Sequence, residues 1–117
     1  MAARIRMTSV DSAPEDLYGQ IPFTARLLRK VAGPDKPDYW LAELENSLSW
    51  VDAGVSRQIT HIVVATRYEG QTITEDFTRL IVGVAYVTDP SALSDADLSF
   101  AKCRYVAIGE MEAASDA

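Results

Sequence analysis

Two runs of apolar and largely β-branched residues constrain the fold of this 117-residue sequence more than any other feature. One run is ITHIVVATRY (59–68) and the other is RLIVGVAYVTD (79–89). In each run, apolar residues fill both odd and even positions in the middle, and polar residues occupy the ends. Successive side chains of a strand point to opposite faces, so this pattern is typical of strands covered on both faces. The two runs therefore predict the most buried strands of a sheet, a sandwich or a small barrel.

Three further segments follow a strand pattern. Segment 38–51 alternates clearly, with a bulge expected at 46–47, and segment 103–113 alternates as well. Segment 22–31 fits both a helical and a strand spacing of its apolar residues. The turn residues that follow it, AGPDKPD (32–38), favour a hairpin and therefore a strand.

The remaining segments predict turns and one helix. VDAGVSRQ (51–58) contains Gly54, which can adopt a positive φ, and we interpret it as a turn. Segment 69–78 is long for a hairpin loop, and segment 91–99 carries a short helical spacing. The sequence therefore predicts a mainly β fold, a small antiparallel meander or β-barrel of about five strands with one short helix near 91–99.

The domain organisation is simple at this length, because 117 residues suit one domain with one core. Residues 1–20 are polar and interrupted by proline and glycine, which predicts a flexible N-terminal arm able to add a short strand at 3–10. We expect a single β domain at 21–113 and a frayed tail at 114–117.

The net charge of −6 is distributed unevenly. Residues 1–36 carry six basic and four acidic side chains, whereas residues 37–117 carry five basic and thirteen acidic ones. Such an acidic body repels phosphate backbones, and the cluster of Arg26, Arg29 and Lys30 is typical of a solvated face. We therefore expect no nucleic-acid partner and favour a basic protein partner.

Cysteine usage and hydropathy bear on the compartment. No apolar run approaches the roughly 20 residues that cross a bilayer, and the arginines near the start precede no apolar signal segment. Cys103 is the only cysteine, so it forms no internal disulfide and offers no metal-ligand spacing. We expect no membrane association, a cytoplasmic protein, and a buried Cys103.

His61 is the only histidine and a natural candidate for chemistry. A zinc site would need further ligands, and a general base would need an orienting carboxylate and a nucleophile. Glu43 and Glu45 stand about 7 Å apart on one strand face, a spacing at which paired carboxylates can do acid–base or metal chemistry. Alternating acidic residues on an exposed strand face are also an ordinary way to keep a sheet soluble. We expect no metal, no cofactor and no catalytic residue.

Two functional hypotheses remain. The first is a non-catalytic interaction protein, acidic and immunity- or antitoxin-like, that recognises another protein. The second is a small-ligand-binding β-barrel or a minimal enzyme, with a pocket under the 69–78 loop. Its lining would be Trp40, Trp50, His61, Arg67 and Tyr68. In addition, the strands at 22–31 and 103–113 carry few charges to protect an exposed edge, which predicts a homodimer through an edge strand or a sheet face.

Overall fold

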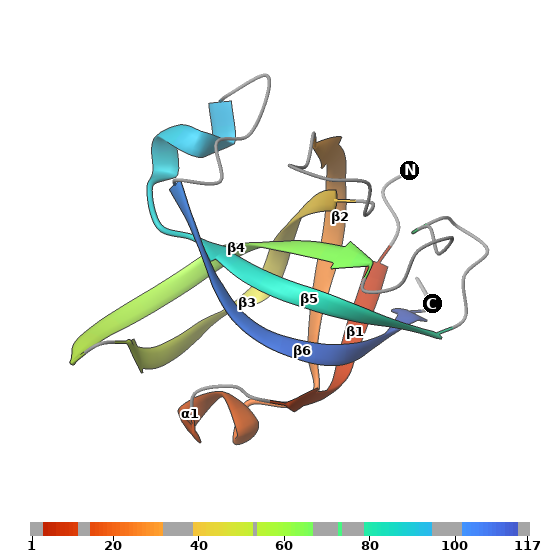
Figure 1. The fold of residues 1–117 in the computed structure, drawn as a ribbon, viewed down its shortest axis with the longest axis horizontal. Coiled ribbons are helices and arrows are strands. Elements are labelled where there is room, and N and C mark those ends of the chain that lie inside the picture. Colours follow the sequence, from red (N-terminus) through yellow and green to blue (C-terminus); the bar gives the residue numbers. More distant parts are fainter. Residues whose placement is uncertain are drawn as a thin grey trace.

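The chain forms a closed antiparallel barrel in a computed structural model, which describes residues 4–11, 15–31, 39–52, 54–66, 73, 79–94 and 102–114 (Figure 1). The six strands are β1 (Arg4–Asp11), β2 (Phe23–Val31), β3 (Tyr39–Asp52), β4 (Val55–Thr66), β5 (Arg79–Val87) and β6 (Cys103–Ala114). Each strand pairs with the next one along the chain, and β6 pairs with β1. The mainly β barrel is confirmed, with six strands where the sequence predicted about five.

Helical structure in the described ranges is short. A four-residue helix, α1 (Glu15–Tyr18), lies in the β1–β2 connection, and a 3₁₀ helix, η1 (Pro90–Ser94), follows β5. The predicted helix near 91–99 thus corresponds to η1, and residues 95–99 lie outside the described residues. No helix in these ranges is long and apolar enough to cross a membrane.

The first strand comes from the segment expected to be an arm. β1 pairs with both β2 and β6, so it closes the barrel. Ile5 and Met7 are each 1% exposed in the core, whereas Arg4 and Arg6, which alternate with them, face outward. This alternation of apolar and charged residues is the ordinary pattern of a strand with one buried face, and it makes β1 a full member of the sheet.

Closure of the barrel also removes the two edges that the sequence analysis left open. The strand predicted at 22–31 pairs with β1 and β3, and the one predicted at 103–113 pairs with β5 and β1. The expectation that these two strands would be exposed edges is therefore wrong. A ring of strands satisfies backbone groups on both sides of each strand, which is how barrels manage edges.

Side chains from all six strands fill the interior. Leu17 from α1 and Ile73 from the β4–β5 connection are also buried in this core, at 1% and 3% exposure. Among the largest fully buried side chains are Ile5, Met7, Leu17, Ile62, Val64, Val82, Tyr86 and Met111. At six strands an antiparallel barrel is narrow enough for its own side chains to occupy the centre.

A second apolar cluster lies on the outside of the wall. Leu41 of β3 and Val63 of β4 pack there with Val31 and with Ala92 of η1. Val63 thus faces outward, whereas its neighbours Ile62 and Val64 face the core. The coverage of β4 on both faces explains its two-sided apolar run.

An irregularity between β3 and β4 changes which side chains face inward. The register shifts between Glu43 and Leu48, which confirms the bulge predicted at 46–47. As a result, Ile59 packs in the core, whereas His61 pairs with the outward-facing Glu43. Strict alternation along a strand would place Ile59 and His61 on one face, and it fails at this point.

Candidate functional site

His61 lies on the outer face of β4. Its side chain is 15% exposed, and its Nε2 atom lies 3.7 Å from the Glu43 carboxylate. Its Nδ1 atom lies 3.0 Å from the Thr60 hydroxyl. Glu43 also pairs with Arg26 at 2.8 Å, so the histidine stands beside a carboxylate that an arginine already neutralises. This arrangement is typical of a histidine that is satisfied at the border of a packed surface.

The remaining residues of the predicted pocket do not join His61. Trp40 packs against the core, on the opposite face of the barrel wall from His61. Arg67 and Tyr68 lie outside the described residues, and so does the side chain of Trp50. The structure therefore brings none of the other predicted lining residues to His61 within the part of the chain that it describes.

The carboxylates of the outer wall are held by arginines. Glu43 pairs with Arg26, and Glu45 pairs with Arg4 at 2.6 Å. The two glutamates share one strand face, as the sequence predicted, but each has its own cation: Arg26 comes from the neighbouring β2, and Arg4 reaches across β2 from β1. They form cross-strand ion pairs rather than a pair of free carboxylates.

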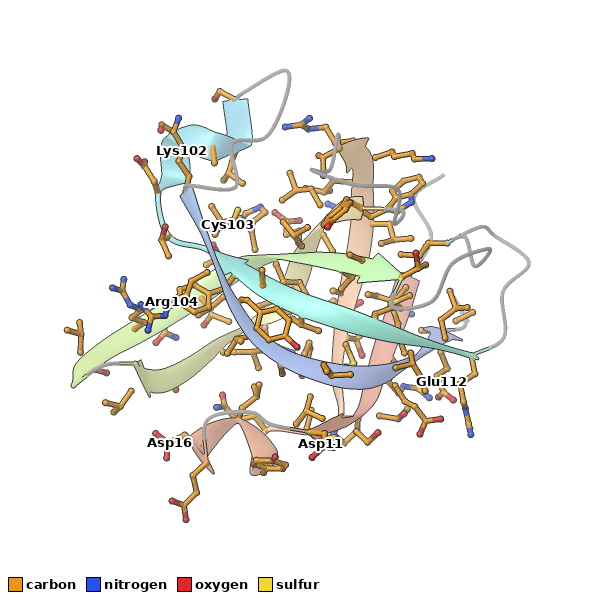
Figure 2. All side chains as sticks on the ribbon, viewed as in Figure 1. Asp11, Asp16, Lys102, Cys103, Arg104 and Glu112 are labelled. Carbon is orange, nitrogen blue, oxygen red and sulfur yellow. The ribbon has the colours of Figure 1, made fainter. Side chains whose placement is uncertain are left out.

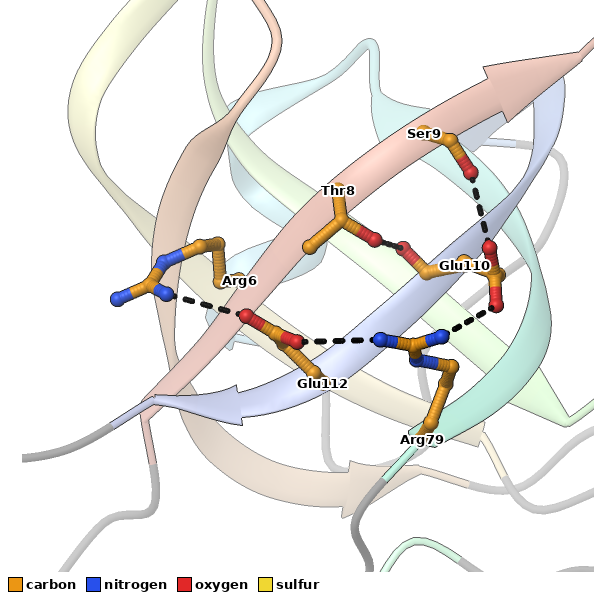
Figure 3. Close-up of polar contacts among 6 residues, drawn as sticks. All are labelled: Arg6, Thr8, Ser9, Arg79, Glu110 and Glu112. Carbon is orange, nitrogen blue, oxygen red and sulfur yellow. Dashed lines mark hydrogen bonds and ion pairs between the residues drawn. The ribbon is translucent and has the colours of Figure 1, made fainter.

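A second set of ion pairs crosses β1, β6 and β5 (Figure 3). Arg6 contacts Glu112 at 3.0 Å, and Arg79 contacts both Glu112 and Glu110, at 3.8 and 3.5 Å. The Ser9 hydroxyl donates a hydrogen bond to the Glu110 carboxylate. Such partly exposed pairs are worth about 0.2–1 kcal/mol each, but together they leave this wall with little net charge.

The six strands carry eight basic and six acidic side chains, so the acidic excess of the protein lies outside them. Nine of the eleven basic side chains and eight of the seventeen acidic ones belong to residues whose side chains the structure describes. The other nine acidic and two basic side chains belong to the connections, the tail and Asp52. The acidic excess of the protein is therefore carried by the segments between the strands and not by the barrel wall.

Beyond the wall, β3 and β4 continue as a two-stranded hairpin, which we define as residues 48–59 and call the projecting hairpin (Figure 1). Its register ends at the pair Asp52 and Val55, and Gly54 in the two-residue turn has φ +81°. The sequence interpretation of 51–58 as a turn is therefore too long, because the two strands stay paired as far as Asp52 and Val55. A positive φ at the second turn residue suits glycine, which has no Cβ to clash.

One edge of the projecting hairpin is closed by side chains. The amide of Gln20 accepts a hydrogen bond from the Ser49 N–H at 3.0 Å and donates one to the Ser49 carbonyl. The Asp16 carboxylate accepts a hydrogen bond from the Val51 N–H at 3.4 Å. Asp16 belongs to α1, directly beside the hairpin (Figure 2). These contacts replace a neighbouring strand along β3.

The other edge, along β4, is open. Residues that face each other in an antiparallel pair direct their backbone groups in the same sense, either toward each other or away from each other. Ser49 and Val51 direct theirs away from β4, so their partners Gln58 and Ser56 direct theirs away from β3. Pairing of β5 with β4 begins only at Ile62. Within the described part of the chain, no strand or side chain is hydrogen-bonded to this edge.

The inner face of the projecting hairpin is tied to the barrel by an arginine. The guanidinium carbon of Arg57 lies 5.9 Å from the centroid of the Tyr86 ring, and Tyr86 is fully buried. A cation over an aromatic face is attracted by the ring quadrupole. At the tip, Val51 and Val55 are each 52% exposed. The hairpin is thus an anchored element with an open edge and an apolar tip, which makes it a candidate interaction site.

The free cysteine offers little reactivity in comparison. Cys103 packs in the outer cluster near η1 (Figure 2), and burial raises the pKa of its thiol. A raised pKa reduces the fraction of thiolate, which is the nucleophile. Over the described ranges, no group of three or more His, Cys, Asp and Glu side chains is placed to hold a metal ion.

The sequence analysis missed the open edge at Ser56 and Gln58. The available signal was the Gly54 turn between Val51 and Val55, which allows a tight reversal and hence longer strands. No family model, curated protein or solved structure matches this chain.

Proposed function

We propose that this chain is a non-catalytic, cytoplasmic interaction protein that recognises a basic protein partner, in the manner of an immunity protein or an antitoxin. The barrel is the scaffold, and the acidic connections between its strands make the electrostatic contact. Complementary charge steers association and fixes partner choice.

One observation carries this proposal: the acidic excess of the protein lies in the connections at the two ends of the barrel, and we place the contact at the end that holds connection 67–78. The even-numbered strands all end at the same end, so connections 32–38 and 67–78 and the tail 115–117 join the barrel there. These three segments contain six acidic and two basic residues. The connections at the other end, 12–22 and 88–102, contain five acidic residues and one basic residue. The strands between the two ends carry no acidic excess.

A pull-down with a matched charge control tests the proposal. Glu75→Gln/Asp76→Asn removes two carboxylates from connection 67–78. Asp95→Asn/Asp97→Asn removes two from the β5–β6 connection, which joins the barrel at the other end. We expect the wild type and the control to capture the same basic protein from the native host at about 50 mM and about 200 mM salt, and the first variant to lose it at the higher salt.

Two results would contradict the proposal. One is the absence of any stoichiometric protein partner for the wild type at both salt concentrations. The other is a partner that both double variants retain equally, because binding would then not depend on the carboxylates of connection 67–78.

A further inference from the structure

The open edge of β4 lacks the protection that exposed edges usually carry. Natural sheets guard their edges with charged side chains, proline or a covering element. The β3 edge of the projecting hairpin is covered by Gln20 and Asp16. At the β4 edge, the residues with outward backbone groups are Ser56 and Gln58, and both are uncharged. An uncharged, projecting edge of this kind is a template for another strand.

We propose that the chain forms a two-fold dimer in which β4 of one copy pairs antiparallel with β4 of a second copy, centred on Gln58. Strand pairing between identical edges is self-complementary, and a two-fold contact repeats every interaction twice. This inference rests on the open edge alone and does not depend on the basic partner proposed above.

The length of the open edge selects the register. The edge begins at Val55, the first residue of β4, and ends at His61, because Ile62 already pairs with Tyr86 of β5. Two identical edges overlap completely only when the two-fold axis passes through their middle residue, which is Gln58. Because Gln58 directs its N–H and C=O outward, the two Gln58 residues can exchange both backbone hydrogen bonds at the axis.

Charge selects the same register. With the axis at Gln58, Arg57 of one copy faces Ile59 of the other. A shift of the axis by one residue toward the turn would place Arg57 opposite Arg57 of the second copy, and like charges directly opposite each other are destabilising. A shift the other way would leave Val55 and Ser56 without partners on the open edge. The projecting hairpin lies at the end of the barrel away from connections 32–38 and 67–78. The dimer therefore leaves these two connections of both copies free.

Sedimentation equilibrium at micromolar concentration tests the proposal with a matched pair of variants. Gln58→Lys places two lysines at the axis, and Ser49→Lys adds the same charge to the facing residue on the closed edge. We expect wild type and Ser49→Lys to sediment at twice 12.8 kDa. We expect Gln58→Lys to sediment at 12.8 kDa, with its dimer weakened about tenfold or more.

A disulfide probe tests the same strand pairing without adding a charge to the edge. In a Cys103→Ser background, Gln58→Cys should form an intermolecular disulfide under mild oxidation, because facing residues lie about 5.5 Å apart at Cα. Ser49→Cys should stay reduced. A wild-type mass of 12.8 kDa that does not change on concentration overturns the proposal. A Gln58→Lys variant that remains dimeric overturns it as well, and partner capture by the monomeric variant reports separately on the proposed function.

Discussion

At the scale of single residues, two glycines in neighbouring strands differ in the space available for a side chain. A Cβ at Gly109 would overlap the Ser9 carbonyl oxygen and lie 2.9 Å from the Met7 sulfur. A Cβ at Gly83 would meet only the Tyr105 ring, at an ordinary 3.5 Å. We expect Gly109→Ala to lower the free energy of unfolding by about 1–3 kcal/mol and Gly83→Ala to change it by less than about 1 kcal/mol. Urea denaturation measures both, and equal losses would contradict the close approach of β1 and β6.

At the same scale, the thiol of Cys103 makes the free energy of unfolding depend on pH. Burial raises its pKa above the ordinary 9.0, so the unfolded chain loses this proton first as the pH rises. The corresponding stability is present below pH 9 and lost as the pH rises through the folded pKa. We expect iodoacetamide to label the folded protein more slowly than the urea-unfolded chain at pH 8, and Cys103→Ala to lose less stability above pH 9. Equal labelling rates would show that the thiol is accessible.

At the scale of elements, the projecting hairpin depends on a side chain outside its own strands. Gln20→Glu keeps the acceptor for the Ser49 N–H but removes the donor to the Ser49 and Asp16 carbonyls. We expect a loss of about 1–3 kcal/mol and faster hydrogen exchange at the Ser49 amide, because a carboxylate would face two carbonyl oxygens. Asn46→Asp makes the same chemical change at an exposed position on β3 and should stay within about 0.5 kcal/mol of wild type. Unchanged exchange in Gln20→Glu would contradict the edge closure.

The same elements show what the sequence could predict. The alternation of apolar residues in the sequence indicates buried strands, so β3, β4, β5 and β6 were predicted close to their positions. Segment 51–58 was not, because this part of the hairpin is mostly exposed and needs few apolar residues, and its polar Ser56 and Gln58 resemble a turn. The predicted pocket failed to assemble around His61 because sequence gives the alternation within a strand but not the face that one strand shares with the next.

At the scale of the whole molecule, closure depends on the first strand. Deletion of residues 1–11 removes Ile5 and Met7 from the core and leaves β2 and β6 each with an unpaired edge. We expect the shortened chain to lose its cooperative thermal unfolding, since each large buried side chain is worth about 2–5 kcal/mol and a typical domain has about 5–15 kcal/mol in total. Differential scanning calorimetry measures this transition. An unchanged midpoint would mean that β1 is the loose arm that its polar composition suggested.

A circular permutant separates the presence of β1 from its position in the chain. Arg4 lies opposite Ala114, so residues 115–117 and 1–3 can join β6 to β1 as a hairpin loop when Ala117 is linked to Met1. New ends directly before Gly54 fall at an exposed turn position of the projecting hairpin. We expect this permutant to unfold cooperatively and to keep its stability within about 2 kcal/mol of wild type, because closing so short a loop costs little. Barrel closure depends on which strands are neighbours and not on where the chain begins, so loss of folding in the permutant would contradict the β1–β6 pairing.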